Sequence, residues 1–152
     1  MAWRMEVALL IGVQGVGKTS FYARHLIHSH LRVSRDLVRT RHREQMLFQA
    51  CLDLQQPVVI DNTNPDAEVR ARFLEPARAR GIPVVAYWFV APLADAMRRN
   101  AGREGAARIP EPALRITHRR LVRPSLAEGF SELFDVHPKS GHTFALVRVD
   151  LE

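Results

Sequence analysis

The sequence predicts an α/β fold, in which an open parallel sheet carries helices on both faces. Two observations support it. Short apolar runs bounded by glycine, proline or an acidic residue occur at Met5–Val13, Pro57–Asp61 and Pro83–Val90, as is typical of strands buried on both faces. Segments with helical spacing lie between these runs, so strand and helix alternate along the chain. The length of 152 residues predicts one domain over residues 1–152.

The alternation is clear through the first half of the chain. The apolar strand at Met5–Val13 runs into a glycine-rich loop, and a helix is expected from Lys18 to about His30. A second strand is predicted at Leu31–Ser34. The apolar residues of Glu44–Leu54 repeat at helical spacing, and the strand at Pro57–Asp61 then ends in an acid.

The second half continues the same pattern. Asn64 followed by Pro65 is typical of a helix start, because asparagine caps a helix and proline suits its first position. We expect this helix to run to about Arg80 and to end at Gly81. The later predicted elements are a strand at Pro83–Val90, a helix from Pro92 to about Ala101, a helix at Ala113–Val122, and strands at Phe130–Val136 and Thr143–Leu151.

A phosphate-binding loop joins the first strand to the helix after it. Gly12, Gly17, Lys18 and Thr19 match the spacing G-x-x-x-x-G-K-[ST] in full. Glycines let backbone N–H groups turn toward phosphates, and the following helix presents its positive N-terminus to them. Lys18 is expected to reach the β- and γ-phosphates of ATP, and Thr19 to bind Mg²⁺. The predicted nucleotide-binding residues of the loop are Gly12, Gln14, Gly15, Val16, Gly17, Lys18, Thr19 and Ser20.

Asp61 ends a strand beside this loop. A carboxylate there can hold the water shell of Mg²⁺, so Thr19 and Asp61 form the predicted metal site. The alternative is that Asp61 caps a turn within "DNTNP", because Asp and Asn favour turns. Asn64, in the same segment, is interpreted either as a helix cap or as a residue that binds the phosphate acceptor.

The segment "SRDLVR" at residues 34–39 follows the second strand and places one acid between two arginines. A kinase needs a group that accepts the proton of the attacking hydroxyl. Asp36 would lie across the cleft from the γ-phosphate, while Arg35 and Arg39 would pair with an anionic group of the acceptor. Alternatively, Arg35 and Asp36 form a surface ion pair, and the segment alone does not decide between the two interpretations.

Four blocks of sequence carry a family resemblance. They are "GVQGVGKTSF", "VSRDLVR", "VVIDNTNPDAEVRARFLEPARARGIPV" and "RRNAGREGAARIPEPAL", and with a trailing "PSLAEGFSELFDV" they span nearly the whole chain. In these blocks the chain resembles the kinase domain of the polynucleotide 5′-hydroxyl kinases, of both the phage type and the animal kinase–phosphatase type. The resemblance implies a P-loop NTPase-type parallel sheet with a helical, arginine-bearing lid. It also implies transfer of the γ-phosphate of ATP to the 5′-hydroxyl of DNA or RNA.

The resemblance implies roles for individual residues. Asp36 matches the general base, Arg39 the arginine that contacts the phosphate of the acceptor, and Arg99 and Arg103 the lid arginines that grip the triphosphate. The lid is expected at about residues 99–112, with Arg108 as an alternative lid residue. The predicted catalytic residues are Asp36, Lys18, Arg39 and Arg103, and the predicted acceptor-binding residues are Arg35, Asp36, Arg39 and Asn64.

The composition suits an anionic partner. The formal net charge is +6 and the pI is about 10.6. GC-rich coding is another explanation for the many arginines, because only Lys18 and Lys139 are lysines. The single cysteine, Cys51, excludes an internal disulfide and indicates a reducing, cytoplasmic compartment. No run approaches the roughly 20 apolar residues of a membrane span. We therefore expect nucleic-acid 5′-hydroxyl ends as partner, and no membrane.

Two other functions compete with this one. The first is a small-molecule kinase on the same fold, acting on a sugar, a nucleoside or an antibiotic. The second is a regulatory module that binds NTP and nucleic acid without phosphoryl transfer. The Asp-x-Asp signature of the family's phosphatase domain is missing from the sequence. A kinase-only protein is therefore expected, acting with separate phosphatase or ligase proteins.

Overall fold

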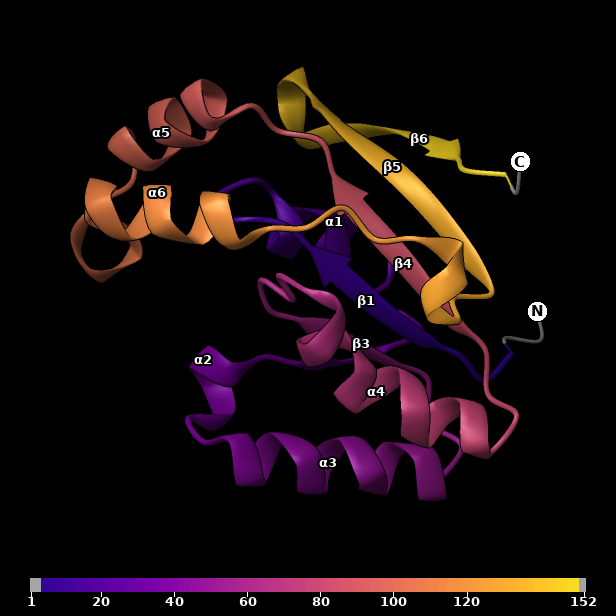
Figure 1. The fold of residues 1–152 in the computed structure, drawn as a ribbon. Helices are drawn as coiled ribbons and strands as arrows, with labels where there is room; N and C mark the ends of the chain where they lie inside the picture. The colour runs from indigo at the N-terminus through magenta and orange to yellow at the C-terminus, as the bar shows by residue number, and fades with distance from the viewer. Residues whose placement is uncertain (1–3, 151–152) are drawn as a thin grey trace.

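A computed structural model of the protein describes residues 4–150 (Figure 1). At its centre lies a six-stranded sheet with the strand order β2-β3-β1-β4-β5-β6. The strands are β1 (Val7–Ile11), β2 (Leu31–Val33), β3 (Val58–Asp61), β4 (Val84–Phe89), β5 (Glu132–Lys139) and β6 (Thr143–Arg148). The first five run parallel, so their carboxyl ends meet at one edge of the sheet. The predicted α/β class is confirmed.

The sixth strand departs from the expected parallel order. β6 pairs with β5 in the antiparallel direction, from Phe134 opposite Arg148 to Lys139 opposite Thr143. Only a three-residue 3₁₀ turn, η3 (Ser140–His142), joins the two strands. A parallel connection needs a crossover of about a dozen residues or more, so this short link forces a hairpin.

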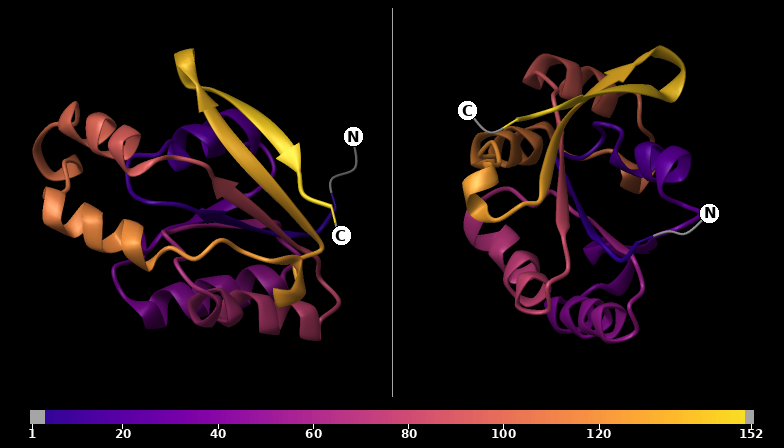
Figure 2. Two further views of the ribbon diagram at one scale, coloured as in Figure 1. Left: turned by 45° about the horizontal axis from the view of Figure 1, so that its top comes forward. Right: turned by 90° about the vertical axis from the view of Figure 1, so that its right-hand side faces the viewer.

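Helices cover both faces of the sheet (Figure 2). Two further short 3₁₀ helices, η1 and η2, lie in the connections beside α6. The helices are α1 (Lys18–His25), α2 (Arg35–Val38), α3 (Arg41–Asp53), α4 (Ala67–Ala79), α5 (Leu93–Ala101), η1 (Gly105–Ala107), α6 (Glu111–Arg120) and η2 (Leu126–Glu128). The helices α5 and α6 lie beyond the carboxyl ends of β1 and β4 in Figure 1. The predicted lid, at about residues 99–112, spans the end of α5, the connection with η1 and the start of α6.

Every residue of β1 is fully buried, because the strand packs against helices on both sides. Its alternate residues Val7, Leu9 and Ile11 belong to one apolar cluster with Phe48 of α3 and Phe73 of α4. Ala8 and Leu10 belong to a second cluster, which includes residues of α1, α5 and α6. The loop after β1 therefore starts from a fully buried, closely packed strand.

The start of α4 corrects the sequence prediction. Asp66, not Asn64, caps this helix, because its carboxylate accepts a hydrogen bond of 2.9 Å from the backbone N–H of Val69. Asn64 lies before the cap with a positive φ of 48°. The helix ends as predicted, with Gly81 at a φ of 70° just beyond it.

Two other differences concern short segments. α1 ends at His25 rather than near His30, because the backbone N–H groups of Ser29 and His30 turn back to the carbonyl of Leu26. The short helix α2 was not predicted and contains Arg35 and Asp36. It carries these two residues to the carboxyl edge of the sheet.

Candidate functional site

The loop between β1 and α1 has the geometry of a phosphate cradle. Gly15 and Gly17 have φ values of 80° and 108°, in the region where a side chain would be strained. Gly17 stands at the N-cap of α1, so the first backbone N–H groups of this helix face the loop without a side-chain cap. An anion bound in the loop would satisfy them.

Lys18 lies deep in this loop, with 8% of its surface exposed. Its ammonium group donates a hydrogen bond to the carbonyl of Gly12. Burial lowers the pKa of Lys18 to about 8, while the nearby carboxylates of Asp61 and Asp36 act in the opposite direction. The positive charge of Lys18 is thus only partly compensated by its neighbours, and the oxygens of a bound phosphate would provide further negative charge.

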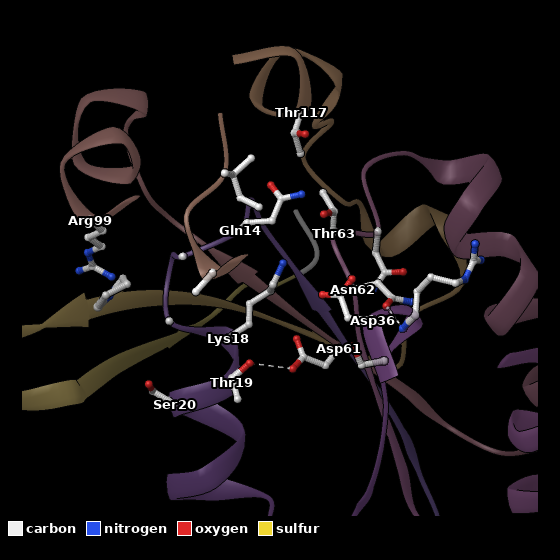
Figure 3. Close-up of a pocket in the computed structure, with 18 of the residues that line it drawn as sticks. Gln14, Lys18, Thr19, Ser20, Asp36, Asp61, Asn62, Thr63, Arg99 and Thr117 are labelled. Carbon is white, nitrogen blue, oxygen red and sulfur yellow. Dashed lines mark hydrogen bonds between the residues drawn. The ribbon is translucent and has the colours of Figure 1, made fainter. Parts of the chain in front are cut away.

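Thr19 and Asp61 are brought together as predicted. The hydroxyl of Thr19 donates to the carboxylate of Asp61 at 3.1 Å, shown by the dashed line in Figure 3. Hydroxyl and carboxylate oxygens are the donors that Mg²⁺ prefers, so these two residues fit the ion. Within residues 4–150, no group of three or more His, Cys, Asp or Glu lies close enough to hold a metal by itself. Phosphate oxygens would have to complete the coordination of Mg²⁺.

The lid lies directly over the loop. The guanidinium of Arg99 donates to the carbonyl of Val16 at 2.8 Å. Arg103 packs over Gly15, where a Cβ would come within 3.3 Å of its Nη1. That Nη1 atom is buried and makes no hydrogen bond. A buried donor without an acceptor is costly, so Arg103 is ready to bind an anion above the loop.

The lid is held in shape by its own side chains. The amide of Asn100 exchanges two hydrogen bonds with the backbone of Ile109, at 2.6 and 2.8 Å. These bonds close the glycine-containing connection between α5 and α6. The alternative lid residue Arg108 is exposed and does not line the cavity. The structure therefore favours Arg99 and Arg103 over Arg108 as the arginines that cover the loop.

One cavity of about 1110 Å³ joins the loop, the lid and the ends of β2 and β3. Lys18 and Asp36 both line it, as do Gln14 and Ser20 of the predicted loop residues. Figure 3 shows Lys18 between Arg99 on one side and Asp36 on the other. The sheet order explains this arrangement, because β2 and β3 lie on one side of β1 and β4 on the other. The cavity thus has the phosphate loop and Arg99 on one side and Asp36 on the other.

Arg35 takes part in a hydrogen-bond network at the start of α2. Its guanidinium donates to the buried carboxylate of Glu44 at 2.9 and 3.3 Å, and its backbone N–H donates to Asn62 at 2.8 Å. Asn62 in turn donates to Glu44 at 2.7 Å. This network fixes the start of α2. Arg35 also lines the cavity, and its predicted contact with the acceptor stays a prediction.

Asn64 has a structural role, and its predicted contact with the acceptor stays a prediction. Its amide N–H₂ donates to the carbonyls of Leu10 at 2.8 Å and Ile60 at 3.3 Å, so it ties the ends of β1 and β3. The side chain is 1% exposed. Beside it, the backbone N–H of Gly12 donates to the carbonyl of Thr63, which links the phosphate loop to the segment after β3.

Arg39 does not line the cavity. It is exposed, and it lies between α2 and α3 with a φ of 75°, which is strained for a residue with a side chain. The predicted contact with an acceptor phosphate therefore stays a prediction.

Sequence reasoning missed three residues of the site, namely Arg32, Glu44 and Asn62. Arg32 donates to Asp61 at 2.7 Å from the neighbouring strand. Glu44 is 1% exposed although it stands in the first turn of a helix rich in charge. Asn62 directly follows Asp61, the predicted metal ligand. This position within "DNTNP" is the one feature of the sequence that could have identified it.

A model of the family described as "AAA domain" matches residues 39–124, more than half of the chain. The chain belongs to this family. The matched segment contains Asp61 and both lid arginines, whereas the phosphate loop precedes it. The two parts of the site are therefore supported separately, by a family match and by a local motif.

The curated relative is the bifunctional polynucleotide phosphatase/kinase of Schizosaccharomyces pombe (strain 972 / ATCC 24843). It is 26% identical over 135 residues, which are 86% of this chain and 33% of that protein. The chain thus spans about a third of the length of the curated relative that it matches.

Solved structures share the fold. They include a gluconokinase from Sinorhizobium meliloti 1021 (TM-score 0.64, 16% identity, 89% of this chain and 84% of that chain). Kti12 of Chaetomium thermophilum in complex with ADP-AlF3 has a TM-score of 0.67 at 14% identity, with 90% and 92% covered. A sugar kinase from Janibacter sp. HTCC2649 has a TM-score of 0.65 at 18% identity, with 86% and 85% covered. The chain therefore shares its fold with these proteins.

Proposed function

We propose that this protein transfers the γ-phosphate of ATP to the 5′-hydroxyl end of DNA or RNA. The observation that carries the proposal is one cavity in which Asp36 stands opposite Lys18 across the metal pair of Thr19 and Asp61. A kinase needs an acid on the acceptor side and cations on the donor side, and this cavity has both. The similarity to a polynucleotide phosphatase/kinase supports the choice of acceptor.

The chemistry follows from the positions of these side chains. The hydroxyl oxygen of the acceptor forms a bond to the γ-phosphorus, the bond to the β,γ-bridging oxygen breaks, and ADP leaves. Asp36 accepts the proton of the hydroxyl. Lys18, Arg99 and Arg103 stabilise the charge on the phosphoryl group and the leaving ADP. Thr19 and Asp61 would hold Mg²⁺, which neutralises charge on the β- and γ-phosphates when bound.

The charge of the cavity favours an anionic acceptor. Basic side chains outnumber acidic ones among its lining residues, and Arg72 of α4 and Arg120 of α6 line the same cavity. Thr63 lines it as well. A nucleic-acid end presents phosphates next to the reacting hydroxyl, so such cations suit it.

A small-molecule acceptor is the competing proposal. The fold shared with a gluconokinase and a sugar kinase keeps this alternative open. The large cavity would admit a sugar as readily as the end of a strand. The two proposals use the same donor site and the same Asp36, and they differ only in the acceptor whose hydroxyl lies next to Asp36.

A transfer assay decides between them. The protein is given [γ-³²P]ATP and Mg²⁺ with 5′-hydroxyl DNA, 5′-hydroxyl RNA, the same strands already 5′-phosphorylated, or gluconate. We expect label on the 5′-hydroxyl strands alone. The Asp36→Asn variant should lose about 100-fold or more of the rate while it still binds ATP.

The control variant is Asp53→Asn, which changes an exposed acid of α3 that pairs only with Arg80 on the surface. It should keep the full rate. Label on gluconate but on no strand would overturn the nucleic-acid acceptor. Undiminished transfer by Asp36→Asn would overturn the role of Asp36.

A further inference from the structure

Arg32 stands at the metal pair although no function has yet been given to it. Its side chain extends from β2 to the end of the neighbouring β3, where its Nε donates to Oδ2 of Asp61 at 2.7 Å. Its Nη2 lies 3.5 Å from the hydroxyl oxygen of Thr19. One guanidinium therefore reaches both oxygen donors that would bind Mg²⁺.

The same carboxylate oxygen serves two partners. Oδ2 of Asp61 accepts from the hydroxyl of Thr19 and from Arg32. The side chain of Asp61 is only 3% exposed, so water contributes little to its solvation and the charge of Arg32 balances it. A divalent cation that approached Asp61 would meet a fixed positive charge at the carboxylate it needs.

We propose that Arg32 is a built-in counter-ion that competes with Mg²⁺ for Asp61. The metal then binds well only together with nucleotide, because phosphate oxygens bring the negative charge that Arg32 has already neutralised. This inference rests on the proposed function only through the metal pair of Thr19 and Asp61. Arg32 then lowers the affinity of the site for free Mg²⁺ and makes no contact with the reacting atoms.

Metal binding without nucleotide tests the proposal. Mn²⁺ replaces Mg²⁺, and its free concentration is followed by electron paramagnetic resonance as protein is added. The variant Arg32→Gln keeps a hydrogen-bond donor for Asp61 but removes the charge, and Arg32→Lys keeps the charge. We expect Arg32→Gln to bind Mn²⁺ about tenfold more tightly than the unaltered protein, and Arg32→Lys to bind it as weakly.

Opposite results have a clear meaning. Equal or weaker Mn²⁺ binding by Arg32→Gln would overturn the competition and make Arg32 merely a support that orients Asp61. Asp61→Asn should abolish the gain of Arg32→Gln when the two changes are combined. If Asp61→Asn left Mn²⁺ binding in the presence of ADP unchanged, the metal pair itself would be wrong, and with it that part of the proposed function.

A second measurement needs no variant at all. Thermal unfolding of the unaltered protein is recorded with Mg²⁺ alone, with ADP alone, and with both. Competition predicts no rise of Tm with Mg²⁺ alone and the largest rise with Mg²⁺ and ADP together. A rise with Mg²⁺ alone as large as that with both would overturn the proposal, even if Arg32→Gln failed to fold.

Discussion

The carboxylate of Glu44 on α3 holds the guanidinium of Arg35 on α2 at 2.9 Å, and Glu44 is almost completely buried. The same carboxylate accepts from Asn62 at 2.7 Å. Asp36 follows Arg35 directly, so its position depends on this buried acid. Glu44 is thus a positioning residue for the proposed base.

Replacing Glu44 should disturb both stability and turnover. We expect Glu44→Ala to lower the free energy of unfolding by about 2 kcal/mol, because Arg35 and Asn62 both lose their acceptor. The rate of phosphoryl transfer should fall by about tenfold or more through displacement of Asp36, with the Kd for ADP unchanged. Chemical denaturation and single-turnover kinetics measure the two effects. Glu75→Gln, which changes an exposed acid of α4, serves as the control.

The lowered pKa of Lys18, about 8, predicts a pH dependence of nucleotide binding. Above pH 8 the free protein has lost the charge on Lys18, so binding of a phosphate must take up a proton. The affinity for ADP should therefore fall by about tenfold between pH 7 and pH 9. Calorimetry in buffers of different ionisation enthalpy would show the proton uptake. The variant Lys18→Arg keeps its charge, and an equal fall in that variant would contradict the assignment.

The lowered pKa of Lys18 also makes the stability of the folded protein depend on pH. Lys18 in the unfolded chain has its ordinary pKa near 10.5 and keeps its proton to higher pH than in the folded protein, where the pKa is about 8. Because the unfolded state binds more protons in this window, the contribution of Lys18 to stability rises as pH rises from about 8 to 10.5.

Arg99 should matter to nucleotide binding more than Arg115, an exposed arginine of α6. Its guanidinium already bonds to the carbonyl of Val16 and lies over the loop. We expect Arg99→Ala to weaken ADP binding by about tenfold, the equivalent of one charge-assisted hydrogen bond. Arg115→Ala, on the exposed surface of α6, should leave the Kd within about twofold. Equal losses in both variants would mean that the lid acts only through its general charge.

We expect the buried ion pair of Arg70 to contribute more to the free energy of unfolding than a surface ion pair does. Its fully buried guanidinium bonds Glu128 at 2.9 and 3.1 Å and also bonds the carbonyls of Asn64 and Val122. Arg70→Met should therefore lower the free energy of unfolding by about 3 kcal/mol. Arg80→Met, which breaks a surface pair with Asp53, should cost less than about 1 kcal/mol. Denaturation in urea measures both, and similar losses would show that the buried pair gives no special support.

The parts of the structure that were predicted correctly depend on short stretches of sequence. β1, β3 and β4 are apolar runs because both of their faces are covered, and the phosphate loop is defined by the spacing of four residues. The role of Arg32 depends on Asp61, 29 residues away, and that of Glu44 on Arg35, 9 residues away. Only the fold brings these parts of the chain together. Asn64 was predicted as a helix cap because Asn-Pro is common at helix starts, but its amide donates to buried carbonyls at the ends of two strands instead.

The direction of β6 likewise could not be predicted from the composition of the strand itself. An apolar strand of this length fits a sheet in either direction, and only the brevity of η3 decided that it turns back. A consequence is that Phe144 comes to lie against the phosphate loop, where a Cβ on Gly17 would be 3.2 Å from its ring. The loop is thus covered from two sides, by the lid and by the hairpin.

The sheet order also makes this protein a candidate for segment exchange. The acceptor side of the cavity comes from one continuous piece of chain, β2 through α4, whereas the donor side comes from the loop before it and the lid after it. That piece joins the remainder at only two places, before Leu31 and after Ala79. Transplanting it from a protein of the same fold would replace the acceptor half together with Asp61, while the phosphate loop and the two lid arginines would come from this protein.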